Sequence, residues 1–96
     1  MRLKGKKCIV TGGSSGIGEA TVRRFISEGA EVLIADINLE DSKKLSEEIG
    51  EGVDYIKCDV RLEDDIISVS EKAYGMWDQV DVLVNNAGSE LNQSYD

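Results

Sequence analysis

The sequence has 96 residues, of which 41% are hydrophobic and 31% are charged, and its formal net charge is −8. This composition is ordinary for a globular chain, and the length allows one small domain with a core. Because the chain is strongly acidic, we expect neither nucleic acid nor an anionic membrane as its main partner. The chain contains no histidine, which excludes imidazole catalysis, and we predict no metal site.

The expected location is the cytoplasm. No apolar run approaches the roughly 20 residues of a membrane span, and residues 1–5 lack the apolar middle of a signal peptide. Cys8 and Cys58 fall in predicted strands with a third strand expected between them, a separation too wide for a disulfide. We therefore expect two buried free thiols in a reducing compartment.

The spacing of apolar residues alternates between that of strands and that of helices along the chain. Four apolar runs predict strands at 8–10, 32–35, 53–58 and 80–84. Between them, helical spacing predicts one helix that ends at Gly29, a second from Asn38 to Gly50, and a third that ends near Trp77. The residues expected to face the sheet are Ile17, Ala20, Val22, Phe25 and Ile26, then Leu39, Ser42, Leu45 and Ile49, then Leu62, Ile66, Val69, Ala73 and Trp77.

Strands that alternate with helices through short connections predict an α/β fold with a parallel sheet of right-handed crossovers. We expect a Rossmann-type sheet with strand order 3-2-1-4, which is half of a doubly wound fold. The first two helices should cover one face and the third helix the other. The strand at 80–84 is nearly all apolar, as central strands are, yet no later strand in the chain could lie beside it. We therefore expect this fourth strand to self-associate or to pair with another polypeptide.

A glycine-rich loop, Thr11-Gly12-Gly13-Ser14-Ser15-Gly16-Ile17-Gly18, joins the first strand to the first helix. This pattern predicts a cradle for the pyrophosphate of a dinucleotide. Gly12 would allow the sharp turn, Gly16 would leave space for the pyrophosphate, and Gly18 would let the helix pack closely. The positive end of that helix would face the anion. The alternative is an ordinary turn between a strand and a helix.

The loop, Asp36, Cys58-Asp59-Val60 and Asn85-Asn86-Ala87-Gly88 resemble the short-chain dehydrogenase/reductase family in their order and spacing. The likeness covers nearly the whole chain up to Gly88, and it is to the amino-terminal, cofactor-binding half of such an enzyme. It implies an NAD-binding Rossmann half-domain at residues 1–88. Residues 89–96 would then be a polar tail at the start of a missing second half.

By this resemblance, Asp36 accepts hydrogen bonds from the adenosine ribose and repels a 2′-phosphate. Family members that prefer NADP usually place a basic residue in the loop or after this aspartate, where this chain has Ser14, Ser15 and Ile37. The resemblance therefore implies NAD as the preferred cofactor, with NADP as the weaker one. The alternative role for Asp36 is to help cap the second helix.

Asp59 resembles the residue that contacts the adenine amino group, with the Val60 backbone beside it; alternatively, Asp59 only starts a helix. Arg61 stands where the family often has threonine, which leaves the capping of that helix open. Asn86, Ala87 and Gly88 resemble the segment along the cofactor riboses, whereas Asn85 is expected to bond across the sheet. The predicted cofactor-binding residues are Gly12, Ser14, Ser15, Gly16, Ile17, Gly18, Asp36, Ile37, Asp59, Val60, Asn86, Ala87 and Gly88.

The catalytic groups of the family are a serine, a tyrosine and a lysine four residues after that tyrosine. None of Tyr55, Tyr74 and Tyr95 has a lysine four places on, so we predict no catalytic residue in this chain. The resemblance implies the cofactor-binding part of an NAD-dependent oxidoreductase that acts on an alcohol or carbonyl, inactive by itself. The alternative is a complete short nucleotide-binding protein that serves as a regulatory or assembly subunit without catalysis.

Overall fold

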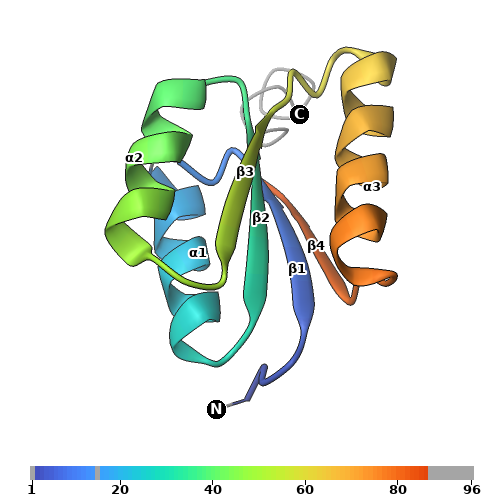
Figure 1. The fold of residues 1–96 in the computed structure, drawn as a ribbon. Helices are drawn as coiled ribbons and strands as arrows, with labels where there is room; N and C mark the ends of the chain where they lie inside the picture. The colour runs from blue at the N-terminus through green and yellow to red at the C-terminus, as the bar shows by residue number, and fades with distance from the viewer. Residues whose placement is uncertain (1, 15, 87–96) are drawn as a thin grey trace, which may run out of the picture.

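The computed structural model describes residues 2–14 and 16–86. Three predicted site residues, Ser15, Ala87 and Gly88, and the tail at 89–96 lie outside the described residues. Strands and helices alternate as the apolar spacing predicts (Figure 1), and the elements are β1 (Lys7–Thr11), α1 (Gly16–Ser27), β2 (Glu31–Asp36), α2 (Leu39–Ile49), β3 (Val53–Lys57), α3 (Glu63–Trp77) and β4 (Val82–Asn85).

The four strands form one parallel sheet in the order β3-β2-β1-β4, which confirms the predicted topology. In its centre, Val10 of β1 lies opposite Ile34 of β2 on one side and Val84 of β4 on the other. Because all four strands are parallel, their carboxyl ends meet at one edge of the sheet. At this edge, the glycine-rich loop follows β1, and Asp36 is the last residue of β2.

Each face of the sheet has its own apolar core. On one face, Cys8 and Val10 pack with Val22 of α1 and Leu45 of α2. On the other face, the packing residues are Ile9, Leu33 and Ala35 of the sheet with Val69 and Ala73 of α3. Figure 1 shows α1 and α2 on one side of the sheet and α3 on the other, as predicted.

The two cysteines are buried free thiols, as predicted. Cys8 lies in β1 and Cys58 directly follows β3, and β2 separates the two strands in the sheet. They also belong to the cores on opposite faces.

The predicted helical faces are wrong at the first turns of the helices. Ile17 is 77% exposed, and the other residues expected to face the sheet but found exposed are Ala20, Leu39, Leu62 and Ile66. These residues lie at or near the amino-terminal ends of the helices, which begin at the carboxyl edge of the sheet. The apolar spacing therefore identifies the helix correctly but overestimates how much of it is covered.

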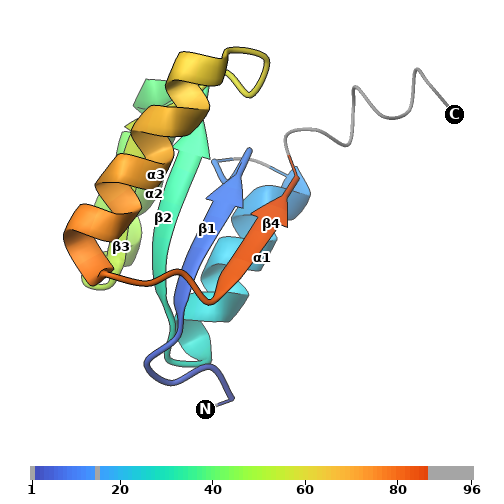
Figure 2. The ribbon, with the colours of Figure 1, turned by 90° about the vertical axis from the view of Figure 1, so that its right-hand side faces the viewer.

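Among residues 2–14 and 16–86, strand β4 has β1 as its one neighbour and forms an edge of the sheet, as the predicted strand order requires, although its apolar sequence is typical of a central strand. Figure 2 shows α3 lying over β2 and β3 rather than over β4. Leu83 of β4 is consequently 64% exposed. No helix within the described part of the chain is long and apolar enough to span a membrane.

Candidate functional site

The loop after β1 depends on glycine at two positions of left-handed backbone. Gly12 has a φ of +66° and Gly16 a φ of +56°, conformations that residues with a Cβ rarely adopt. The Gly12 amide donates to the carbonyl of Ala35 at 2.8 Å, which ties the start of the loop to β2. A Cβ on Gly16 would meet no atom within 4 Å, so this side of the loop is open.

Gly18 brings α1 into direct contact with the loop. A Cβ at this position would lie 1.9 Å from the carbonyl oxygen of Gly12 and 2.8 Å from Nδ2 of Asn86. The same Nδ2 donates to the Gly12 oxygen at 3.2 Å, so the end of β4 also holds the loop. The close packing predicted for Gly18 is therefore present, and Asn86 has a structural contact that sequence analysis did not anticipate.

Thr11 and Asn85 connect the ends of β1 and β4. The Thr11 hydroxyl donates to Oδ1 of Asn85 at 3.0 Å. Asn85 therefore bonds across the sheet, as predicted.

Gly13 is also closely packed, which was not expected from the sequence: a Cβ there would lie 3.1 Å from Cγ2 of Val22 and 3.2 Å from Cγ2 of Ile34. The signal that could have identified this close packing is the Gly12-Gly13 doublet, since two consecutive glycines exceed what one turn needs.

The first turn of α1 points its main-chain N–H groups at this loop. The first N–H groups of an α-helix have no carbonyl acceptor within the helix, and the aligned peptide dipoles make this end positive. Since Gly16 opens the loop on this side, the arrangement fits an anionic group such as a diphosphate. Ile17, in the same turn, leaves its side chain exposed beside the open space.

Asp36 ends β2 and faces the glycine-rich loop. Asp36 is buried, with 7% of its surface exposed. Oδ2 accepts hydrogen bonds from the amide of Ser14 at 3.0 Å and from its hydroxyl at 2.5 Å. Oδ1 accepts from the amide of Asn38 at 2.9 Å. The structure thus brings the predicted residues Ser14 and Asp36 into contact.

The N-cap of α2 is Asn38 rather than Asp36. The Asn38 side chain accepts a hydrogen bond from the amide of Asp41 at 3.0 Å, in the manner of a helix-capping residue. Asp36 contributes to this turn only through the amide of Asn38. A role in capping α2 therefore explains only the bond from the Asn38 amide to Oδ1 of Asp36. It does not explain the bonds from Ser14 to Oδ2.

Asp59 follows β3 at the same edge of the sheet. Its carboxylate is bound by Arg61 through the main-chain N–H, Nε and Nη2, at 3.0, 3.0 and 2.8 Å. These contacts lower the pKa of Asp59 to about 2, with the Arg61 side chain as the main cause. Helix α3 has Leu62 as its N-cap and no side-chain capping bond. Arg61, which replaces the threonine common in the family, therefore does not cap this helix.

Two apolar residues accompany the carboxylates at this edge. Ile37 follows Asp36 and is exposed, and Val60 follows Asp59 and is half-buried. Val60 packs against the core beneath α3, so its main chain is held in place. The predicted residues after β2 and β3 are thus at one edge of the sheet with the loop.

The remaining reactive groups are poorly placed for chemistry. Burial raises the pKa of both thiols, Cys8 and Cys58, which disfavours the reactive thiolate. Within residues 2–14 and 16–86, no group of three or more acidic or cysteine side chains could hold a metal ion.

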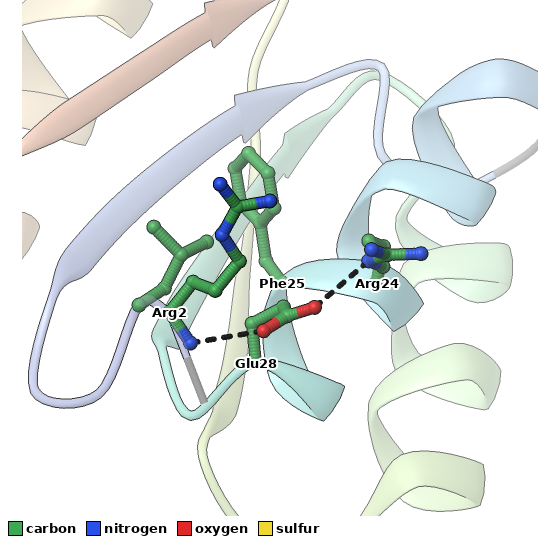
Figure 3. Close-up of a pocket in the computed structure, with 5 residues that line it drawn as sticks. Arg2, Arg24, Phe25 and Glu28 are labelled. Carbon is green, nitrogen blue, oxygen red and sulfur yellow. Dashed lines mark hydrogen bonds and ion pairs between the residues drawn. The ribbon is translucent and has the colours of Figure 1, made fainter.

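A cavity of about 390 Å³ lies at the amino ends of the strands, on the opposite edge from the glycine-rich loop. It is lined by Arg2, Leu3, Arg24, Phe25 and Glu28. Figure 3 shows Glu28 engaged on both sides, by the amide of Arg2 at 2.9 Å and by Nε of Arg24 at 3.1 Å. Because Glu28 pairs with Arg24, the cavity presents no cluster of unpaired positive charge to an anion.

Known proteins that resemble this chain in sequence or structure include several short-chain dehydrogenases and reductases. The family model described as short chain dehydrogenase matches residues 6–95. A similar relative is the (21S)-21-acetoxyl-apo-melianone synthase SDR of Melia azedarach, 41% identical over 87 residues that cover 91% of this chain and 32% of that protein. Another is 3beta-hydroxysteroid dehydrogenase 2 of Eggerthella lenta, 40% identical over 89 residues, 90% of this chain and 34% of the relative.

A solved structure is also similar, the 3-ketoacyl-(acyl-carrier-protein) reductase from Brucella melitensis complexed with NADH. Its TM-score is 0.82 at 33% identity, and the match covers 84% of this chain and 33% of that chain. The present chain therefore spans about a third of the length of the proteins it matches.

Proposed function

Because this chain belongs to the short-chain dehydrogenase family, whose members bind a nicotinamide dinucleotide, we propose that it is the cofactor-binding portion of an NAD-dependent oxidoreductase acting on an alcohol or carbonyl. One observation carries the proposal: the glycine-rich loop that leads into the open, positively polarised start of α1 is hydrogen-bonded through Ser14 to the buried carboxylate of Asp36. The first group suits a diphosphate, and the second suits the hydroxyls of the ribose that follows.

Each predicted residue has a place in this proposal. Gly12, Gly16, Ile17 and Gly18 would present main-chain groups to the diphosphate. Asp36, which Ser14 holds against the loop, would accept from the adenosine ribose. Ile37 and Val60 would flank the adenine, and Asp59 would accept from its amino group. Asn86 would continue along the riboses, and the proposal extends to Ser15, Ala87 and Gly88, outside the described residues. When bound, the cofactor would supply hydride transfer.

The preference for NAD over NADP is proposed from charge. A 2′-phosphate would bring additional negative charge to the buried carboxylate of Asp36, whose loop neighbour is the uncharged Ser14. Two unit charges 4 Å apart interact by about 4 kcal/mol at an effective dielectric constant of 20, which is enough to discriminate between cofactors.

The proposal does not give this chain a catalytic role. Tyr55 lies within β3 and Tyr74 within α3, and neither is followed by a lysine four residues later. We propose that residues 1–88 form the cofactor-binding half-domain, that 89–96 begin a second half, and that the 96 residues are inactive alone. A cytoplasmic location belongs to the same proposal, since both cysteines are free thiols.

Calorimetric titration of the 96-residue chain with NAD and with NADP tests the proposed function. We expect NAD to bind weakly but at least about tenfold more tightly than NADP, which corresponds to about 1.4 kcal/mol. Tighter binding of NADP would reject the proposed preference, and no binding of either would reject the cofactor-binding function. Reading the coding region past Asp96 for a Tyr-x-x-x-Lys segment separates the enzyme portion from the regulatory-subunit alternative.

Self-association through β4 is a further part of the proposal. β4 offers an edge of main-chain groups with the exposed Leu83, and such edges template pairing with another strand. We expect the chain to sediment as a dimer or larger species at high concentration, and Leu83→Lys to shift it to the monomer. Leu39→Lys, at an exposed leucine on α2 across the sheet, is the matched control and should leave the distribution unchanged. A wild-type chain that remains a monodisperse monomer would contradict this prediction.

A further inference from the structure

Arg61 uses its side chain to bind the carboxylate of Asp59, two residues before it. The Arg61 side chain is 66% exposed, whereas that of its partner Asp59 is only 16% exposed. Nε donates to Oδ1 of Asp59 and Nη2 donates to Oδ2, so the guanidinium grips both oxygens of the carboxylate. The main-chain N–H of Arg61 adds a third bond, to Oδ1. This two-pronged geometry fixes the plane of the carboxylate, which a single contact would not.

The main chain of Asp59 is held independently of Arg61. The Asp59 amide donates to Oδ2 of Asp65 at 2.9 Å, and the Asp59 carbonyl accepts from the amide of Leu62 at 2.9 Å. Only the side-chain torsions of Asp59 are therefore left for Arg61 to fix. Replacement of Arg61 should leave the turn before α3 folded and the main-chain bond to Oδ1 in place, while removing the two side-chain bonds that fix the plane of the carboxylate.

The contacts leave Asp59 with a restricted capacity to accept further hydrogen bonds. A carboxylate offers about four lone-pair sites, two on each oxygen. Arg61 donates twice to Oδ1 and once to Oδ2, so the remaining site is on Oδ2. The bound carboxylate also stays ionised, because the contacts with Arg61 hold its pKa near 2.

We propose that Arg61 is a positioning residue that makes Asp59 a fixed acceptor of one hydrogen bond, and thereby selects a 6-amino purine over a 6-oxo purine. The inference rests on the proposed function, since it concerns the adenine end of the same site. A 6-amino group donates to the remaining position on Oδ2, whereas a 6-oxo group would place a carbonyl oxygen against a carboxylate that cannot donate. A carboxylate held only by the main-chain N–H of residue 61 could turn its free oxygen to accept from the adjacent ring N–H of the 6-oxo purine, so discrimination requires the Arg61 side chain.

NMR titration of the 96-residue chain with NAD and with nicotinamide hypoxanthine dinucleotide tests the inference. The two dinucleotides differ only in the 6-substituent of the purine and in the proton on the adjacent ring nitrogen, so the ratio of their dissociation constants reports recognition of that edge of the base. We expect the wild type to prefer NAD by about tenfold, as expected for a hydrogen bond to a charged group. Arg61→Ala should reduce this ratio at least threefold, and Arg61→Lys should restore it only in part, because an ammonium cannot grip both oxygens.

Arg24→Ala is the matched control, because Arg24 also pairs with a carboxylate on the surface but lies at the opposite edge of the sheet. This variant should keep the wild-type ratio. A general loss of stability would weaken both dinucleotides equally, so only the ratio measures positioning. If neither dinucleotide binds, the proposed function fails together with the inference. If both bind and Arg61→Ala keeps the wild-type ratio, the inference fails and the proposed function stands.

The pKa of the Asp59 carboxyl, measured by NMR, gives a readout that needs no cofactor. We expect a pKa of about 2 in the wild type, rising toward the ordinary value in Arg61→Ala and unchanged in Arg24→Ala. The pKa of Asp59 is lower in the folded chain than the ordinary value of about 3.9. The contact with Arg61 therefore stabilises the fold fully at a pH above about 3.9, and this stabilisation is lost as the pH falls through about 2. An Asp59 pKa that does not rise in Arg61→Ala would overturn the inference.

Discussion

The substitution Gly18→Ala is expected to destabilise the fold by about 3 kcal/mol or more and to abolish dinucleotide binding. The added Cβ would lie 1.9 Å from the Gly12 carbonyl oxygen, so α1 would have to move away from the loop that it helps to form. Helix propensity acts in the opposite direction, because alanine is favoured over glycine in a helix by about 1 kcal/mol. Urea denaturation followed by circular dichroism measures the net result.

Gly75→Ala is the matched control for this prediction. Gly75 lies within α3, and a Cβ there would meet no atom within 4 Å. The same substitution should therefore stabilise the fold by about 0.5–1 kcal/mol, through propensity alone. Equal effects of the two substitutions would contradict the packing assigned to Gly18.

Asp36→Asn is expected to raise the affinity for NADP at least about tenfold relative to that for NAD. The substitution removes the negative charge that would face the 2′-phosphate, and one decade of affinity is about 1.4 kcal/mol. The amide retains an oxygen that can accept from Ser14 or Asn38, so much of the local hydrogen bonding can persist. Paired titrations with the two cofactors give the change in their ratio.

Asp78→Asn is a suitable control for the loss of one negative charge. Asp78 is exposed at the end of α3 with a φ of 63°, a conformation that asparagine also tolerates, and it lies at the opposite edge of the sheet. The NAD-to-NADP ratio of this variant should equal that of the wild type. If Asp36→Asn also leaves the ratio unchanged, Asp36 does not determine the choice of cofactor.

Local patterns in the sequence determined the order of strands and helices, the parallel topology and the roles of three of the four loop glycines, Gly12, Gly16 and Gly18. These features depend on short-range chemistry. The short continuous apolar run Val32 to Ala35 has the length of a buried strand rather than of a helix. Gly12 and Gly16 are needed where the backbone is left-handed. Short connections between alternating elements then leave few possible topologies.

Tertiary structure alone decided which parts of the predicted faces are covered and which polar groups meet. Ile17 has the spacing of a core residue, yet its side chain is exposed, whereas the adjacent Gly18 is buried against the loop. Ser14 and Asp36 are 22 residues apart in sequence and form a buried hydrogen bond only because β1 and β2 are neighbours. Asn86 reaches Gly12 across 74 residues for the same reason, since β4 lies beside β1. Periodicity reports the preference of one segment, whereas burial and long-range hydrogen bonds depend on which other segments lie beside it.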